Sequence, residues 1–193
     1  VARRMFNVFE EALPRSGAEI GSIRGALLDG GALGAVMTGT GSGAFSPNAT
    51  ITRGMLVTIL YRLEDEPAVT AANPFTDVSS GSYCEKASAW AAANGIVGGY
   101  GDGRFGPNDA LTREQLAAIL YRYAQYKGYD LSASADLSSY SDQAGISAFA
   151  RTAMAWANAE GLITGTSGSL LSPKGTATRA QTAMILMRFC QKV

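Results

Sequence analysis

The chain contains no histidine, which removes the side chain that most often serves as a general base or as a transition-metal ligand. Its 193 residues carry 16 basic and 16 acidic side chains, so the net charge is zero and no overall field favours nucleic acid or an anionic membrane. No apolar run approaches the roughly 18 residues that a membrane span needs. We therefore expect no nucleic-acid partner and no membrane insertion, and any bound anion must be held by local groups.

Cysteine is scarce as well. The two cysteines, Cys84 and Cys190, fall on predicted helices, where buried thiols are the simpler interpretation, although a disulfide cannot be decided from two positions. No carboxylate pair, Ser or Cys nucleophile or metal cluster stands at catalytic spacing, so we expect no enzyme, no metal and no cofactor. The sequence starts at Val1 without a signal peptide, and we expect it to be a piece of a larger protein.

One pattern, in contrast, occurs three times. A Gly-rich loop leads to an aromatic residue or Leu, one further residue and Pro, and then Thr-Arg opens an apolar helix at Arg53, Arg113 and Arg179, which are 60 and 66 residues apart. A unit of about 60 residues has a marginal core by itself, so the copies are expected to stack on one another and share a core. The expected repeats are residues 1–66, 67–130 and 131–193.

Each repeat is expected to be mainly helical. In the second, an Ala-rich helix is predicted over about residues 83–94, and a second helix follows Thr112, which forms a capping box with Gln115. Thr178 and Gln181 give the same signal in the third repeat. The first repeat follows the pattern only from Val36 onward, so its front half is interpreted as degenerate. Short irregular or extended segments are expected in the Gly-rich loops.

The arginine after each capping Thr stands at the first position of its helix. There the helix dipole disfavours a cation by roughly 0.3–1 kcal/mol. An arginine that recurs at this position in all three repeats therefore indicates a specific interaction. Free N–H groups of the first turn together with a guanidinium would suit a carboxylate or phosphate. The alternative is an ion pair with a neighbouring repeat. A second set of arginines recurs near the helix C-termini, at Arg62, Arg122 and Arg188. A cation there is stabilised by the helix dipole, so helix stability is sufficient to explain this set.

Other repeated residues have two interpretations each. The glycines, with Gly99 and Gly103 in the second loop, permit turns or close approach to a ligand or a neighbouring repeat, and Asp102 forms an Asx turn or accepts a sugar hydroxyl. Trp90 and Trp156 pack in the core or stack on a saccharide. Asp77, like Asp142 in the third repeat, is expected to cap a helix.

These residues, in this order, resemble the S-layer homology domain. The resemblance rests on Phe75-x-Asp77, Trp90, Gly95-Ile96-Val97, Asp102-Gly103, Phe105, Pro107 and Leu111-Thr112-Arg113, and on their counterparts in the third repeat. It departs from the family at Gln115 and Gln181, where an acid is common, and in the first repeat, which lacks the Trp and the Phe-x-Asp step.

The resemblance implies a pseudo-threefold, spindle-like helical module with grooves between its repeats. Such modules hold surface proteins to Gram-positive cell walls by binding a secondary wall polysaccharide, typically one with a pyruvate ketal, so the expected location is extracellular, at the cell wall. The family's ligand-contacting Arg would correspond to the three arginines. A surface-layer assembly module that binds protein remains the alternative. The candidate ligand-binding residues are Arg53, Arg113, Arg179, Trp90, Trp156, Gly99, Asp102, Gly103, Gln115, Gln181 and Asp77.

Overall fold

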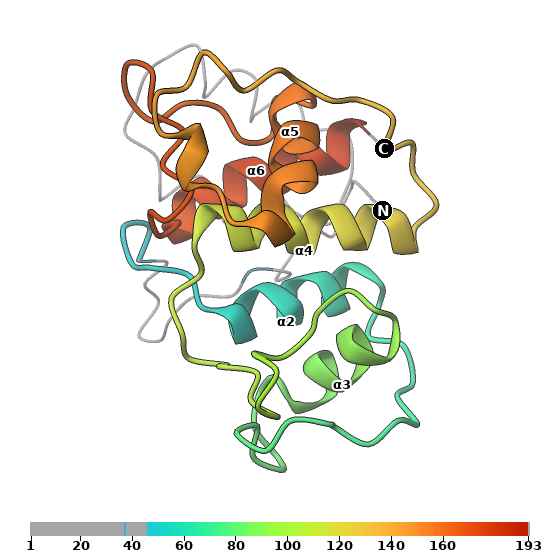
Figure 1. Cartoon of the computed structure of the whole chain (residues 1–193). Helices are drawn as coiled ribbons and strands as arrows, with labels where there is room; N and C mark the ends of the chain where they lie inside the picture. Colours follow the sequence, from blue (N-terminus) through green and yellow to red (C-terminus); the bar gives the residue numbers. More distant parts are fainter. Residues whose placement is uncertain (1–36, 38–45, 193) are drawn as a thin grey trace.

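A computed structural model describes Met37 and residues 46–192 of the chain (Figure 1). Most of the front half of the first repeat, interpreted above as degenerate, lies outside the described residues. The described part is mainly helical, as expected. Its elements are α2 (Arg53–Leu63), α3 (Glu85–Ala93), α4 (Arg113–Tyr126), the 3-10 turns η2 (Gln143–Gly145) and η3 (Ala148–Ala150), α5 (Arg151–Ala159) and α6 (Arg179–Lys192).

The three helices that begin with the repeated Arg lie across the middle of the molecule, with α3 packed on α2 and α5 packed on α4 (Figure 1). Capping explains where they start. Thr112 Oγ1 accepts the Gln115 N–H at 3.3 Å while Gln115 Oε1 accepts the Thr112 N–H at 3.1 Å, which is the predicted capping box. The same two bonds join Thr178 and Gln181 at the start of α6.

A closed ring of backbone hydrogen bonds joins the three repeats just before these helices. The N–H of Leu111 donates to the carbonyl of Ile51 at 3.0 Å, that of Ala177 to Leu111 at 3.0 Å, and that of Ile51 to Ala177 at 3.1 Å. All three residues are fully buried. Each repeat therefore donates to one neighbour and accepts from the other, which is the pseudo-threefold arrangement that the family resemblance implies.

The prolines of the repeated pattern complete this junction. The second N–H of each Thr-Arg helix donates to the carbonyl of the Pro of the next repeat around the ring, at 2.9–3.0 Å. The pairs are Gly54 with Pro107, Glu114 with Pro173, and Ala180 with Pro47. A helix start normally leaves such donors without an intrahelical partner. Here they hold neighbouring repeats together.

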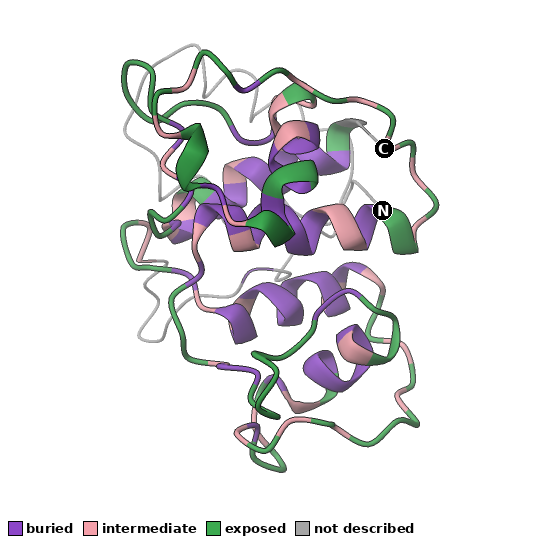
Figure 2. Cartoon of the chain, viewed as in Figure 1, coloured by how far each residue is buried: buried purple, intermediate pink, exposed green. Residues whose placement is uncertain are grey.

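The buried residues form one core to which every described α-helix contributes. Figure 2 shows the buried stretches along these helices. The apolar face of α4, which includes Leu116, Ile119, Leu120 and Tyr123, lies within this core. Cys84 and Cys190 are also buried, as the simpler interpretation expects, and no disulfide joins them. Burial raises the pKa of Cys190 to about 11.

Candidate functional site

The arginine that opens α4 ties two repeats together. Arg113 is only 6% exposed, and its Nε donates to the carbonyl of Leu171 at 3.0 Å while its Nη2 donates to that of Thr164 at 2.6 Å. Arg53 makes the equivalent bonds from α2, to Phe105 at 2.7 Å and Gly98 at 3.0 Å. Both arginines thus bind backbone carbonyls of the Gly-rich loop in the following repeat, and this explains a cation where the helix dipole disfavours one.

These contacts correct the expected basis of anion binding. The first N–H of α4, on Arg113, donates to Gly175 at 2.9 Å, the second donates to Pro173, and the third, on Gln115, donates to the Thr112 hydroxyl. The first turn therefore has no free N–H to offer a ligand. The alternative, an ion pair with a neighbouring repeat, is not observed for Arg53 and Arg113 either, because their guanidinium groups donate to backbone carbonyls. Burial lowers the pKa of Arg53 and of Arg113, and nearby acidic groups partly offset this.

Arg179, the third member of the set, is 3% exposed at the start of α6. Its N–H donates to Ala49 at 2.8 Å, and its Nη1 lies 3.7 Å from the Met55 sulfur of α2. Burial lowers its pKa as well. The loop of the first repeat that corresponds to the bonding partners of Arg53 and Arg113 lies outside the described residues.

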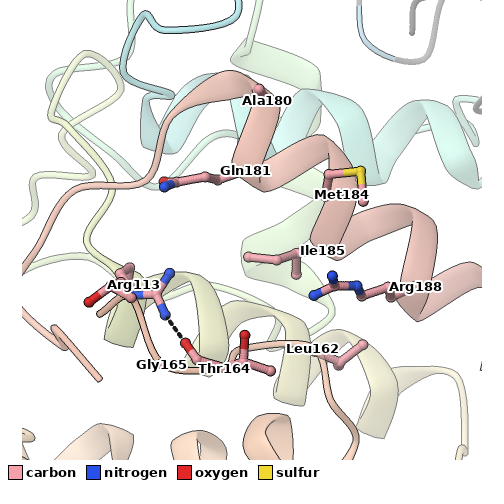
Figure 3. Close-up of a pocket in the computed structure, with 10 residues that line it drawn as sticks. Arg113, Leu162, Thr164, Gly165, Ala180, Gln181, Met184, Ile185 and Arg188 are labelled. Carbon is pink, nitrogen blue, oxygen red and sulfur yellow. Dashed lines mark hydrogen bonds between the residues drawn. The ribbon is translucent and has the colours of Figure 1, made fainter. Parts of the chain in front are cut away.

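A groove opens beside Arg113, between the second and third repeats (Figure 3). Its volume is about 350 Å³, within the usual range of small-ligand sites. Arg113 lies on one side, the loop at Thr164 and Gly165 forms the floor, and α6 contributes Gln181 and Arg188 on the opposite side (Figure 3). The remaining lining residues are Leu162, Thr166, Ala180, Met184 and Ile185.

Equivalent residues line a second groove, beside Arg53. Gly98 stands in the place of Thr164, Gln115 in the place of Gln181, and Arg122 in the place of Arg188. This groove measures only about 40 Å³. Arg122 and Arg188 were explained above by helix stability alone, and their place on the groove walls was missed. Their recurrence at the same spacing as the first set was the signal.

The two tryptophans belong to the core. Trp90 and Trp156 are each 4% exposed. Trp90 packs edge-on against Tyr126 at 5.8 Å between ring centroids, and Trp156 packs against Tyr121 at 5.4 Å. Neither has the free ring face that sugar stacking requires, so the structure favours the core interpretation over the ligand-binding one.

Neither Asp77 nor Asp142 caps a helix with its side chain, so the expected role is wrong for Asp77, and Asp142 stands at the N-cap position of η2 without a capping hydrogen bond. Asp77 accepts the N–H groups of Phe105 and Gly106 at 2.7 and 2.8 Å, while α3 begins at Glu85. Asp142 likewise binds the N–H groups of Leu171 and Ser172 in the third repeat. Each carboxylate therefore holds its Gly-rich loop closed.

These bonds also set the acidity of the two groups. Burial raises the pKa of Asp77, but backbone N–H donors, with Phe105 and Gly106 foremost, and the charge of Arg104 together outweigh it, so the pKa lies below its usual value. The hydrogen bond from Leu171 is the main cause of the lowered pKa of Asp142.

The Gly-rich loop of the second repeat folds on itself. Asp102 accepts the Arg104 N–H at 3.0 Å, which is the Asx turn, one of its two expected roles. A side chain at Gly99 would place its Cβ 2.5 Å from the Arg104 carbonyl, so this position requires glycine. Gly103 adopts φ 84° and its carbonyl accepts the Thr76 N–H at 3.0 Å. The three residues shape the loop whose carbonyls Arg53 binds.

The S-layer homology domain, as a family model, matches residues 32–54, 74–117 and 139–183, more than half of the chain. Each match lies within one of the three expected repeats. The chain belongs to the S-layer homology domain family. The inter-repeat grooves beside Arg53 and Arg113 are thus grooves of an S-layer homology module, and the loops, prolines and Thr-Arg steps that build them lie mostly within the matched segments.

Several relatives carry S-layer homology sequences similar to this chain. An endoglucanase of Bacillus sp. KSM-635 is 35% identical over 82% of the chain, which is 17% of that protein. The surface-layer 125 kDa protein of Lysinibacillus sphaericus is 30% identical over 82% of the chain and 13% of its own length. A cellulosome-anchoring protein of Acetivibrio thermocellus is 26% identical over 48% of the chain and 22% of its own length. The chain thus spans less than a quarter of each of these relatives.

Within the described part of this S-layer homology module, no three His, Cys, Asp or Glu side chains gather as a metal site would require. The helices found in that part are all too short or too polar to cross a membrane. The groove beside Arg113 presents guanidinium, amide and hydroxyl groups beside aliphatic side chains.

Proposed function

We propose that this chain anchors a larger surface protein to the bacterial cell wall by binding an anionic wall polysaccharide in the grooves between its repeats. The family membership supports an anchoring role, since the relatives include proteins named for the surface layer and for cellulosome anchoring. The proposed location is extracellular, at the cell wall of a Gram-positive bacterium. The module itself is proposed to bind rather than to catalyse.

The observation that carries this proposal is the chemistry of the Arg113 groove. Its described lining contains two arginines, Arg113 and Arg188, and no acidic residue. Arg113 uses Nε and Nη2 for backbone bonds, while its Nη1 makes no hydrogen bond with the described residues. Two cations beside Gln181 and Thr166 suit a sugar that carries a carboxylate, because guanidinium groups bind carboxylates and amides and hydroxyls bind sugar hydroxyls.

A pyruvate ketal is a carboxylate of this kind, held rigidly on a sugar ring. The proposed ligand is therefore a pyruvylated wall polysaccharide, contacted by Arg113, Arg188 and Gln181. Arg53, Gln115 and Arg179 are the corresponding candidates at the other two junctions. Four further candidates would contribute indirectly, because they shape the Gly-rich loop that Arg53 binds: Asp77, Gly99, Asp102 and Gly103.

A methyl hexoside with a pyruvate ketal tests the proposal directly. Titration calorimetry with the whole chain should show binding of this probe, and the neutral methyl ester of the same probe should bind roughly ten- to hundredfold more weakly, since it lacks the charge. Equal affinity for acid and ester, or binding of neither the probe nor purified wall polysaccharide, would overturn the proposal.

Arg188→Gln is the appropriate groove variant. Arg188 is only partly buried, and its hydrogen bond to the Gly161 carbonyl is long at 3.5 Å, so the substitution should leave the melting temperature almost unchanged. Binding of the acidic probe should nevertheless weaken about tenfold. Sedimentation with intact cell walls provides the second readout, and walls stripped of their polysaccharide should fail to retain the chain.

The protein-binding alternative gives a different pattern. An assembly module would associate with copies of a surface protein, and its binding would not depend on the polysaccharide. If the chain remains bound to stripped walls, or if the acidic probe does not displace it from intact walls, the alternative is favoured.

A further inference from the structure

The two described grooves are equivalent in sequence but differ almost ninefold in volume, at about 350 Å³ beside Arg113 and about 40 Å³ beside Arg53. The smaller space holds only a few water molecules. The walls themselves are matched: Gln115 and Arg122 face one groove as Gln181 and Arg188 face the other. The difference in volume must come from residues that are not matched.

Tyr100 is the first such residue. The guanidinium of Arg53 contacts the rings of both Tyr100 and Phe105, with its carbon 4.9 Å from each ring centroid. The Tyr100 hydroxyl lies close enough to Asp109 and to Gln115 of α4 for these side chains to influence its pKa, so the ring extends from the loop toward the opposite wall. The position equivalent to Tyr100 beside Arg113 is Thr166, whose hydroxyl bonds to Ser172 at 2.7 Å and stays on its own loop.

Phe149 is the second unmatched residue. It belongs to η3 of the third repeat and lines the groove beside Arg53 together with Gln115 and Arg122. The residue is 56% exposed, which is unusual for a phenylalanine, so it lies at the solvent-exposed edge of this groove. No phenylalanine or tyrosine occurs in the described lining of the Arg113 groove.

We propose that Tyr100 and Phe149 close the Arg53 groove, and that of these two grooves only the one beside Arg113 accepts the acidic sugar. The proposal rests on the proposed function and adds to it which groove is used and which side chains decide this. Thr166 is then the permissive residue: its short side chain leaves the guanidinium of Arg113 open to the cavity, whereas two aromatic rings contact the guanidinium of Arg53.

Chemical shifts of backbone amides locate the ligand in each groove separately. On titration of the isotope-labelled whole chain with the pyruvylated methyl hexoside, the amides of Thr164 and Gln181 should shift, and those of Gly98 and Gln115 should not. Thr166→Tyr transfers the closing residue to the open groove. It should weaken binding there about tenfold or more, with the melting temperature unchanged because Thr166 is exposed.

The reciprocal variant, Tyr100→Thr with Phe149→Ala, should open the Arg53 groove, so that Gly98 and Gln115 now shift with the ligand. Arg122→Gln is the matched control for Arg188→Gln and should leave the affinity of the wild-type chain within about twofold. Shifts at Gly98 and Gln115 in the wild type equal to those at Thr164 and Gln181 would overturn the inference while leaving the proposed function intact. If the wild-type chain binds neither this probe nor wall polysaccharide, both this inference and the proposed function are overturned.

Discussion

Arg113 Nη2 lies 2.6 Å from the carbonyl oxygen of Thr164, so the first side chain of α4 is bound to the Gly-rich loop of the next repeat. Arg53 and Gly98 have the same relationship one repeat earlier. A guanidinium is suited to this role because its fixed fork of donors reaches two carbonyls at once. The repeated Thr-Arg step is therefore a structural link between repeats before it is a candidate ligand contact.

Arg113→Ala should accordingly destabilise the fold, by about 2–4 kcal/mol, because it removes two charge-assisted hydrogen bonds and leaves the carbonyls of Leu171 and Thr164 without their donor. Urea unfolding followed by circular dichroism measures this loss. Loss of wall binding by this variant alone would not identify a ligand contact, which is why Arg188→Gln is the better binding test.

Arg151→Ala provides the matched control. Arg151 also opens a helix, α5, but it is exposed. Its removal should change the free energy of unfolding by no more than about 0.5 kcal/mol. If both variants lose the same stability, or neither does, the inter-repeat bonds of Arg113 do not carry the effect assigned to them.

The sequence was sufficient for the repeat, the helices and the capping boxes, because these follow from local patterns such as the apolar face of α4 and the Thr112–Gln115 pair. The grooves were only partly predictable. Arg113 attracted attention because helix electrostatics disfavours it, yet its partners lie 51 and 58 residues away in the sequence, where spacing alone cannot place them. Arg188 was overlooked because a cation near a helix C-terminus already has a local explanation.

Asp77 is a second residue whose contacts could not be predicted from the local sequence. A carboxylate shortly before a helix is typical of a cap, but this one binds N–H groups 28 and 29 residues further along the chain. Closing the Gly-rich loop is a tertiary interaction, and nothing in the local pattern distinguishes it from capping. Trp90 and Trp156 were ambiguous for a related reason, since exposure depends on what the other helices cover.

The ring of backbone bonds through Ile51, Leu111 and Ala177 predicts the pattern of amide hydrogen exchange. All three donors are fully buried and each bond joins two repeats, so these amides should exchange only through global unfolding and be among the slowest in the chain. The Ala49 amide, which bonds within an exposed turn, should exchange far faster. Fast exchange at one ring position would instead mean that the corresponding pair of repeats separates locally.

Substitution by alanine should change the stability of the fold differently at two adjacent glycines, Gly98 and Gly99. At Gly99 the added Cβ would lie 2.5 Å from the Arg104 carbonyl and 3.2 Å from the Phe75 ring, so Gly99→Ala should destabilise the fold by about 1–3 kcal/mol. At Gly98 an added Cβ would meet no heavy atom within 4 Å, and Gly98→Ala should be neutral or slightly stabilising. Thermal unfolding of the two variants tests this. Equal losses would show that flexibility of the loop, rather than close packing at Gly99, decides the outcome.

Asp142 should make the module sensitive to acid. Its pKa in the folded chain is lowered, chiefly by the Leu171 N–H, so its carboxylate binds protons less readily there than in the unfolded chain. The stabilisation it provides is therefore fully present above the ordinary pKa of about 4 and is lost as pH falls through the lowered folded value. Asp142→Asn should be less stable than the wild type at pH 7, and the two melting temperatures should converge toward about pH 2. A difference that stays constant over this range would show that shape, rather than charge, of this side chain holds the loop.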